Sequence, residues 1–115
     1  MKIIVTGSES FVGRELIAQC LTKGIEVFGF DFEKKSDLPY EFKKGDINDP
    51  KIGDIFPEGA DAMVHLAALS RDKDCAGKAY EAFSTNVMGT LNLVRAAKER
   101  GVRQFIFSSS EWVYE

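Results

Sequence analysis

The sequence predicts an α/β fold in which helices cover both faces of a parallel sheet. Short apolar runs alternate with longer segments of helical period, and these runs are Ile3–Val5, Val27–Phe30, Ala62–Leu66 and Phe105–Phe107. None of the runs alternates between apolar and polar residues, which is typical of strands buried on both faces. Because strands and helices alternate along the chain, we expect right-handed crossovers between parallel strands.

The first helix is predicted over Phe11–Lys23, directly after the first strand. Gly24 follows it, at the position where glycine commonly ends a helix. Its apolar positions are Val12, Leu16 and Cys20 on one stripe, with Ile17 and Leu21 beside them.

Two weaker elements follow the second strand. Tyr40-Glu41-Phe42 is a short apolar run that we interpret as an edge strand, and Asp49–Phe56 predicts a short helix between two prolines. The next helix is longer and runs from about Gly77 to Arg100, a length of about 36 Å. Its apolar residues are Phe83, Val87, Leu91 and Val94, and Gly101 ends it.

Composition and charge exclude several classes of protein. The 115 residues are 44% hydrophobic and 29% charged, which indicates one globular domain and excludes a disordered chain. The net charge of −3 provides no basic field for nucleic acid or anionic lipid. No apolar run is long enough to cross a membrane, and the opening run is too short for a signal peptide. Cys20 and Cys75 have no disulfide or metal-site spacing, so we expect reduced thiols in a cytoplasmic protein and no metal site.

A glycine-containing loop, Thr6–Gly13, joins the first strand to the first helix. Gly7 permits a tight turn, residue 10 lies where backbone approaches a ligand, and Gly13 lets helix and strand pack closely. The first backbone N–H groups of the helix then face an anion. The alternative interpretation is an ordinary strand–turn–helix connection with Ser10 as the N-cap.

Two acidic residues stand at the ends of the next strands. Asp31 follows the second strand, 18 positions after Gly13, where a carboxylate can accept hydrogen bonds from an adenosine ribose. Asp46, within Gly45-Asp46-Ile47, follows the third strand, where it can meet an adenine edge. Either aspartate could instead cap its own loop.

Taken together, the motifs resemble a known family. They are Thr6-Gly7-x-x-Ser10-Phe11-Val12-Gly13, Asp31, Gly45-Asp46-Ile47, Val64-His65-Leu66-Ala67-Ala68, Asn86-Val87-x-Gly89-Thr90-x-Asn92-Leu93 and Phe107-Ser108-Ser109-Ser110-x-x-Val113-Tyr114. In this order they resemble the NAD-dependent epimerase/dehydratase group of the extended short-chain dehydrogenase/reductase superfamily, which contains nucleotide-sugar epimerases. The resemblance implies a Rossmann-type doubly wound sheet with strand order 3-2-1-4-5, here ending after the fifth strand.

The resemblance also implies which residues meet the cofactor. We expect NAD, and the implied cofactor-binding residues are Gly7, Ser10, Phe11, Val12 and Gly13 along the pyrophosphate, Asp31 at the ribose, Asp46 and Ile47 at the adenine, and Leu66, Ala67, Ala68, Ser70 and Asn86 in the groove. The family has glycine in place of Ser10. The Cβ of Ser10 crowds the pyrophosphate, or its hydroxyl donates a hydrogen bond to it. Glu9 beside it adds a negative charge that must point outward.

Three assignments have two interpretations. Asn86 either contacts the cofactor or ties down neighbouring backbone. His65 lies inside an apolar strand and is interpreted as a core histidine rather than a catalytic base. Lys34 and Lys35 could hold a 2′-phosphate, but Asp31 would repel it, so NAD is favoured over NADP.

The resemblance implies that Ser110 is the catalytic hydroxyl group. Family dehydratases carry Thr-Asp-Glu where this chain has Ser110-Glu111-Trp112, which favours an epimerase or reductase over a dehydratase. The family's catalytic Tyr-x-x-x-Lys motif and its substrate domain are absent from the chain. Residues 1–115 are therefore interpreted as the N-terminal part of an NAD-binding domain of a longer enzyme that acts on a nucleotide sugar, inactive alone.

Two other functional classes stay open. One is a non-enzymatic NAD-sensing protein that keeps the fold without the tyrosine. The other is a flavodoxin-like or receiver domain, which the glycine loop and Asp31 disfavour. We also expect self-association into a homo-oligomer, because ending after the fifth strand leaves Phe105–Phe107 on an open sheet edge.

Overall fold

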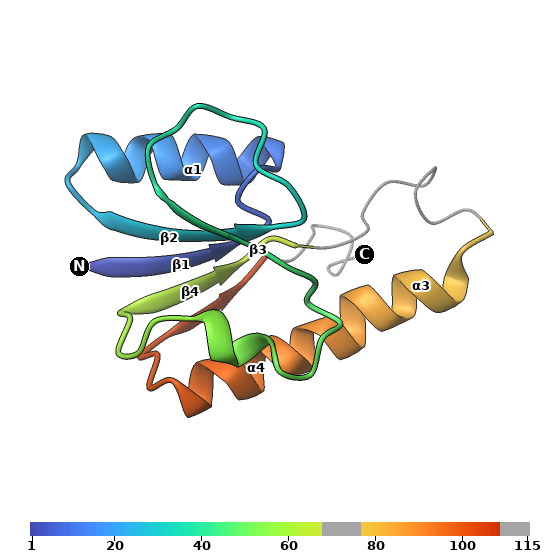
Figure 1. The fold of residues 1–115 in the computed structure, drawn as a ribbon. Helices are drawn as coiled ribbons and strands as arrows, with labels where there is room; N and C mark the ends of the chain where they lie inside the picture. The colour runs from blue at the N-terminus through green and yellow to red at the C-terminus, as the bar shows by residue number, and fades with distance from the viewer. Residues whose placement is uncertain (68–76, 109–115) are drawn as a thin grey trace, which may run out of the picture.

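The computed structural model describes residues 1–67 and 77–108, and its centre is a five-stranded parallel sheet with strand order β3-β2-β1-β4-β5. The strands are β1 (Lys2–Thr6), β2 (Glu26–Asp31), β3 (Glu41–Lys44), β4 (Ala62–His65) and β5 (Phe105–Phe107). The predicted fold class and strand order are confirmed, and the weak run near Tyr40 is the edge strand β3 (Figure 1).

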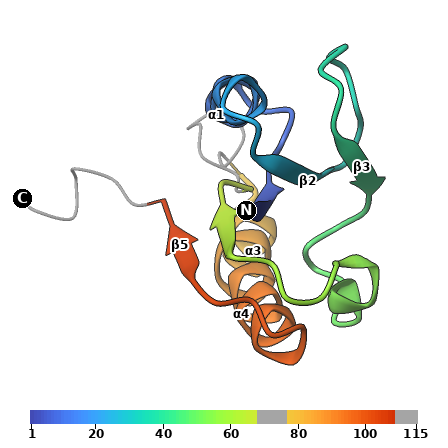
Figure 2. The ribbon, with the colours of Figure 1, turned by 90° about the vertical axis from the view of Figure 1, so that its left-hand side faces the viewer.

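Helices cover both faces of the sheet, as the alternation of elements predicts. Helix α1 (Phe11–Thr22) lies on one face; the short 3₁₀ helix η1 (Ile52–Ile55) and helix α4 (Gly89–Glu99) lie on the other (Figure 2). The short helix expected over Asp49–Phe56 is thus a single 3₁₀ turn.

Successive residues of β1 supply the two cores. Ile3 and Val5 pack on the α1 side with Ile17 and Cys20, whereas Ile4 packs on the opposite side. The second core is larger and includes Phe28, Phe30, Ile47, Ile52, Phe56, Met63, Leu93, Ala96 and Ala97. A central strand buried on both faces explains why the apolar run of β1 is continuous.

The buried stripe of α1 is rotated from its predicted position. The buried residues are Gly13, Ile17 and Cys20, while Val12 is 59% exposed. Gly13 lies against the backbone of the preceding loop, where a Cβ would be 2.2 Å from the Gly7 carbonyl oxygen. The hydrophobicity of Val12 is therefore a poor guide to its burial.

The second long helix is continuous and consists of three consecutive segments. These are α3 (Ala79–Phe83), a π-helical turn η2 (Ser84–Met88) and α4 (Gly89–Glu99), and α3 projects beyond the ends of the strands (Figure 1). The apolar residues of this helix were expected to form its buried stripe, and this expectation is wrong: Phe83, Val87, Leu91 and Val94 are all exposed.

Small side chains set how closely α4 packs against η1. The buried residues of α4 are Gly89, Leu93, Ala96 and Ala97. At Gly53 in η1, an added Cβ would lie 3.0 Å from the Ala96 side chain, so this contact depends on small residues. Leu93 is the large apolar residue of α4 on this buried face, whereas Leu91 and Val94 are exposed.

Within the described ranges, no helix is long and apolar enough to cross a membrane, and no three His, Cys, Asp or Glu side chains are grouped as a metal site would require. Cys20 is buried and free, and burial raises the pKa of its thiol. The other cysteine, Cys75, lies outside the described residues.

Candidate functional site

The loop after β1 is held against both neighbouring strands. The N–H groups of Gly7 and Ser8 both donate to the carbonyl oxygen of Phe30, at 2.9 and 3.1 Å. Gly7 has a φ of +71°, and a Cβ there would lie 2.8 Å from the backbone nitrogen of Ala67. Only glycine satisfies both the left-handed conformation and this close approach.

Ser10 is the N-cap of α1, as one of the two interpretations of the loop predicts. Its hydroxyl accepts from the Gly13 N–H at 3.1 Å and donates to the Gly7 carbonyl at 2.7 Å. Phe11 and Val12 occupy the first two helical positions, where N–H groups have no acceptor within the helix. These two N–H groups and the positive helix end can therefore serve an anion.

Replacing Ser10 by glycine is expected to strengthen NAD binding severalfold with little change in melting temperature. The substitution removes the Cβ beside the expected pyrophosphate position, and a glycine N-cap costs only a few tenths of a kcal/mol. Calorimetric titration and thermal melting provide the two measurements. Ser10→Ala is the control, because it keeps the Cβ but loses the cap, and should give no gain in affinity. Weaker binding by Ser10→Gly would contradict this expectation.

Asp31 lies at the end of β2, beside the glycine loop. Its Oδ2 accepts from the Glu9 N–H at 2.9 Å, and its Oδ1 accepts from the Phe32 N–H at 2.7 Å. A carboxylate can accept about four hydrogen bonds, so Asp31 keeps acceptor capacity for two ribose hydroxyls. The loop-capping interpretation and the ribose interpretation are thus compatible.

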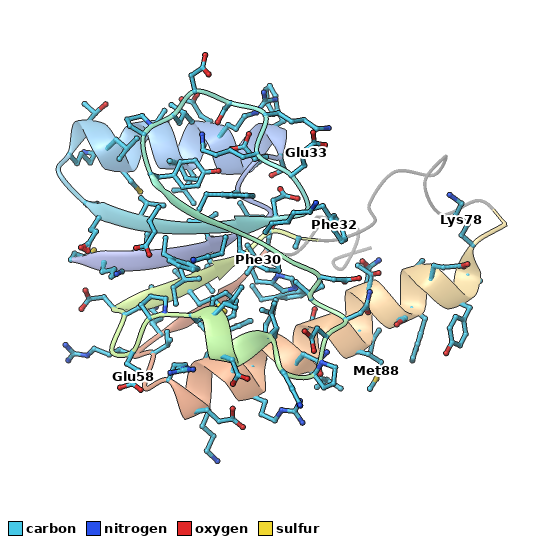
Figure 3. The ribbon with its side chains drawn as sticks, viewed as in Figure 1. Phe30, Phe32, Glu33, Glu58, Lys78 and Met88 are labelled. Carbon is cyan, nitrogen blue, oxygen red and sulfur yellow. The ribbon has the colours of Figure 1, made fainter. Side chains whose placement is uncertain are left out.

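A pocket lies at the carboxyl ends of the strands, next to Asp31. It is lined by Phe30, Asp31, Phe32, Gly45, Ile47, Ala67 and Thr85. Phe30 lies beneath β2 on the α4 side, whereas Phe32 lies beyond the strand end (Figure 3). Of the two residues predicted at the adenine, Ile47 lines this pocket. Asp46 is exposed, and its Oδ1 accepts a hydrogen bond from the Asn48 N–H at 2.9 Å, which forms an Asx turn.

Polar and small residues of the long helix hold the loop that carries Ile47. Asn92 Nδ2 donates to the Ile47 carbonyl at 2.9 Å, and the Asn48 amide bonds to Ser84 and Thr85 in η2. A Cβ at Gly89 would lie 2.6 Å from the Ile47 side chain. The family motif contains Gly89 and Asn92 but assigns them no role, although an isolated glycine in a helix is a sign of close packing.

Asn86 lies in η2, next to the pocket residue Thr85. The Thr90 hydroxyl donates to the Asn86 carbonyl at 2.7 Å. π-Helical turns within α-helices occur frequently at functional sites. Both interpretations of the Asn86 side chain, cofactor contact and backbone anchoring, stay predictions.

His65 is a buried, fully hydrogen-bonded residue, which supports its interpretation as a core histidine. Since the Thr90 hydroxyl donates to Asn86, it accepts from His65 Nε2–H at 2.8 Å. His65 Nδ1 then accepts from the Thr6 hydroxyl at 2.7 Å. This arrangement assigns the neutral imidazole, and burial lowers the pKa of His65 to about 4.

The same network positions the segment after β4. Thr6 Oγ1 accepts from the N–H groups of Leu66 and Ala67, at 3.1 and 3.3 Å. These two predicted groove residues thus lie beside the glycine loop. The other predicted groove residues, Ala68 and Ser70, and the predicted catalytic Ser110 lie outside the described residues.

Glu9 makes a set of contacts that spacing in the sequence does not indicate. Its Oε1 accepts from the N–H groups of Lys35 and Ser36 at 2.8 and 2.6 Å. Its Oε2 accepts from the Ser36 hydroxyl at 2.8 Å and from the Tyr40 hydroxyl. Burial raises the pKa of Glu9, but these hydrogen bonds outweigh burial and lower it to about 2. We call this arrangement of Glu9, Lys35, Ser36 and Tyr40 the Glu9 latch.

The pattern of the NAD dependent epimerase/dehydratase family matches residues 3–115. The chain is 36% identical to a UDP-glucose 4-epimerase of Klebsiella pneumoniae, over 99% of the chain and 92% of that protein. It is 34% identical to a 3 beta-hydroxysteroid dehydrogenase/Delta 5-->4-isomerase of Mycobacterium tuberculosis, over 97% of the chain and 32% of that protein.

Solved structures of longer chains share the fold. A UDP-glucose-4-epimerase of Stenotrophomonas maltophila, with bound NAD and formylated UDP-arabinopyranose, superposes with a TM-score of 0.87 at 27% identity, over 99% of this chain and 38% of that one. A short-chain dehydrogenase/reductase superfamily protein of Agrobacterium tumefaciens with bound NAD superposes with a TM-score of 0.85 at 36% identity, over 99% of this chain and 34% of that one. The chain therefore spans little more than a third of these two structures.

Proposed function

The chain belongs to the NAD dependent epimerase/dehydratase family, and from this membership we propose that it is the NAD-binding part of a nucleotide-sugar epimerase or related oxidoreductase. The observation that supports this most strongly is the meeting of the glycine loop, Asp31 and the pocket of Ile47 at one edge of the sheet. This edge of the sheet combines a helix N-terminus that can bind an anion, a carboxylate that can bind ribose hydroxyls and an apolar surface that can hold a base.

The residues present fit a dinucleotide. A Cβ at Gly13 would lie 2.2 Å from the Gly7 carbonyl oxygen, so the loop keeps its shape only with glycine at this position. We propose that the Phe11 and Val12 N–H groups meet the pyrophosphate, Asp31 the ribose, and Ile47 the adenine. Ser10 stays within the loop by bonding to Gly7 and Gly13.

NAD supplies hydride transfer when it is bound. The contribution of this part of the chain is to bind and orient the dinucleotide and to exclude water from the adenine with the pocket side chains. We propose Ser110 as the hydroxyl that meets the substrate. Against the Thr-Asp-Glu of family dehydratases, Glu111 lengthens one acid and Trp112 replaces the other, which favours epimerisation or reduction over dehydration. The second candidate, a non-enzymatic NAD sensor, would use the same binding residues.

We also propose that the protein forms a homo-oligomer. The outer face of the long helix exposes Phe83, Val87, Leu91 and Val94, and such contiguous apolar surface is typical of interfaces.

Replacing Asp31 by alanine is expected to weaken NAD binding about ten- to a hundredfold. A lost hydrogen bond to a charged group costs about 1.5–3 kcal/mol. Titration calorimetry measures the affinity, and a melting curve shows whether the loop bonds to Glu9 and Phe32 matter for folding. Asp37→Ala is the control, because Asp37 is an exposed aspartate of the same segment. Unchanged NAD affinity in Asp31→Ala would refute the assignment of Asp31 to the ribose.

A further inference from the structure

The Glu9 latch occupies the hydrogen-bond donors of the segment that follows Asp31. Consecutive backbone N–H groups in a turn can bind an anion, and the Lys35 and Ser36 N–H groups form such a pair. Both already donate to Glu9 Oε1. A carboxylate of the chain itself therefore takes the place that a phosphate oxygen would need.

The Lys34 side chain of this segment is also held by contacts within the chain. Lys34 Nζ donates to the Ser36 carbonyl at 2.6 Å and lies 5.0 Å from the centre of the Tyr40 ring. Lys35 is exposed. The segment thus directs its fixed donors toward internal acceptors.

A second acidic residue, Glu9, lies beside Asp31. The Glu9 N–H donates to Asp31 Oδ2 at 2.9 Å, so the two acidic residues are in direct contact through the backbone of one and the side chain of the other. Hydrogen bonds keep Glu9 ionised at neutral pH. The Glu9 carboxylate binds the segment that follows Asp31, and both acidic residues are half-buried. An additional phosphate at Asp31 would therefore be repelled by the charge of Glu9 as well as by that of Asp31.

We infer that Glu9 is a specificity-determining residue, which makes the site reject a dinucleotide with a phosphate on its adenosine 2′-oxygen. The inference rests on the proposed function, in which Asp31 meets the adenosine ribose. Glu9 would add to the preference for NAD over NADP that Asp31 provides. Its carboxylate repels the 2′-phosphate, and it occupies the Lys35 and Ser36 N–H groups that could otherwise bind that phosphate.

The test compares the dissociation constants of NAD and NADP for the wild type and for Glu9→Gln. Glutamine keeps an acceptor for the Lys35 and Ser36 N–H groups but removes the charge. We expect the ratio of the NADP to the NAD dissociation constant to fall by on the order of tenfold. Glu33→Gln is the matched control, since Glu33 is an exposed acid on the same segment, and it should leave the ratio within about twofold (Figure 3).

Tyr40→Phe separates charge from loop order. It removes one hydroxyl bond of the Glu9 latch and keeps the carboxylate, so it should lower stability without changing the ratio. An unchanged ratio in Glu9→Gln, with NAD binding intact, would overturn the inference and leave the proposed function standing. A fall of the ratio in Tyr40→Phe equal to that in Glu9→Gln would also overturn it, because loop order would then be the cause. If the wild type binds neither nucleotide, the proposed function itself fails.

Discussion

Gly13→Ala is expected to lower the free energy of unfolding by about 3 kcal/mol and to weaken NAD binding on the order of tenfold. The new Cβ would lie 2.2 Å from the Gly7 carbonyl oxygen and 3.1 Å from the Ser8 carbonyl carbon. Both are backbone atoms of a loop that is bonded to Phe30. The loop can move only by breaking those bonds, so the clash is not relieved by a side-chain rotation.

Denaturant unfolding and calorimetric titration measure these two effects. Gly24→Ala is the matched control, since Gly24 has a φ of +73° and nothing within 4 Å of its Cβ position. A left-handed alanine there costs about 1–2 kcal/mol, with no effect on NAD affinity. Wild-type affinity in Gly13→Ala would show that the glycine loop does not bind the dinucleotide.

The second large effect is a loss of stability in mild acid that depends on His65. Burial lowers the pKa of His65 from its ordinary 6.5 to about 4. Between these two pH values the unfolded chain binds a proton that the folded chain does not, so protonation favours unfolding. The stabilisation is complete above pH 6.5, declines as pH falls toward 4, and amounts to about 3 kcal/mol.

The measurement is the free energy of unfolding from pH 7.5 to pH 4 for the wild type and His65→Gln. Glutamine does not titrate, so the stability difference between the two proteins should be largest at neutral pH and shrink toward pH 4. Other titrating groups, Glu9 included, contribute equally to both curves. Two parallel curves would mean that His65 titrates as it does in an unfolded chain.

The strands and their order could be predicted because their determinants are local. A run such as Val27–Phe30 is apolar and bounded by polar residues, and Gly24 and Gly101 end their helices with φ of +73° and +67°. The family resemblance then implies the strand order. These features do not depend on which distant residue a side chain meets.

The helix faces could not be predicted because hydrophobicity alone does not decide burial. In α4, Gly89 and Ala96 are buried against Ile47 and Gly53, while Leu91 and Val94 are exposed. The closest approach between two elements favours small side chains, and larger apolar residues are left on the outside. A pattern that counts only large apolar residues therefore selects the wrong face.

The site was predicted best where backbone conformation determines it. Gly7 and Asp31 lie together as expected, since both follow neighbouring strand ends. The Glu9 latch was missed because it joins residues 31 positions apart through side-chain hydrogen bonds. Gly29, inside β2, was an overlooked sign of it: a Cβ there would lie 2.1 Å from the Tyr40 ring.

The central position of β1 has a consequence for the order in which the protein assembles during synthesis. β1 is made first, yet Ile3 pairs with Val27 on one side and with Ala62 on the other. At a translation rate of 5–20 residues per second, β4 emerges about 3–12 s after β1. During this delay β1, β2 and α1 can close the core around Ile17, while Ile4 on the other face waits for its cover. The nascent chain therefore passes through a stage in which half of its sheet is paired and one whole apolar face is open to chaperones.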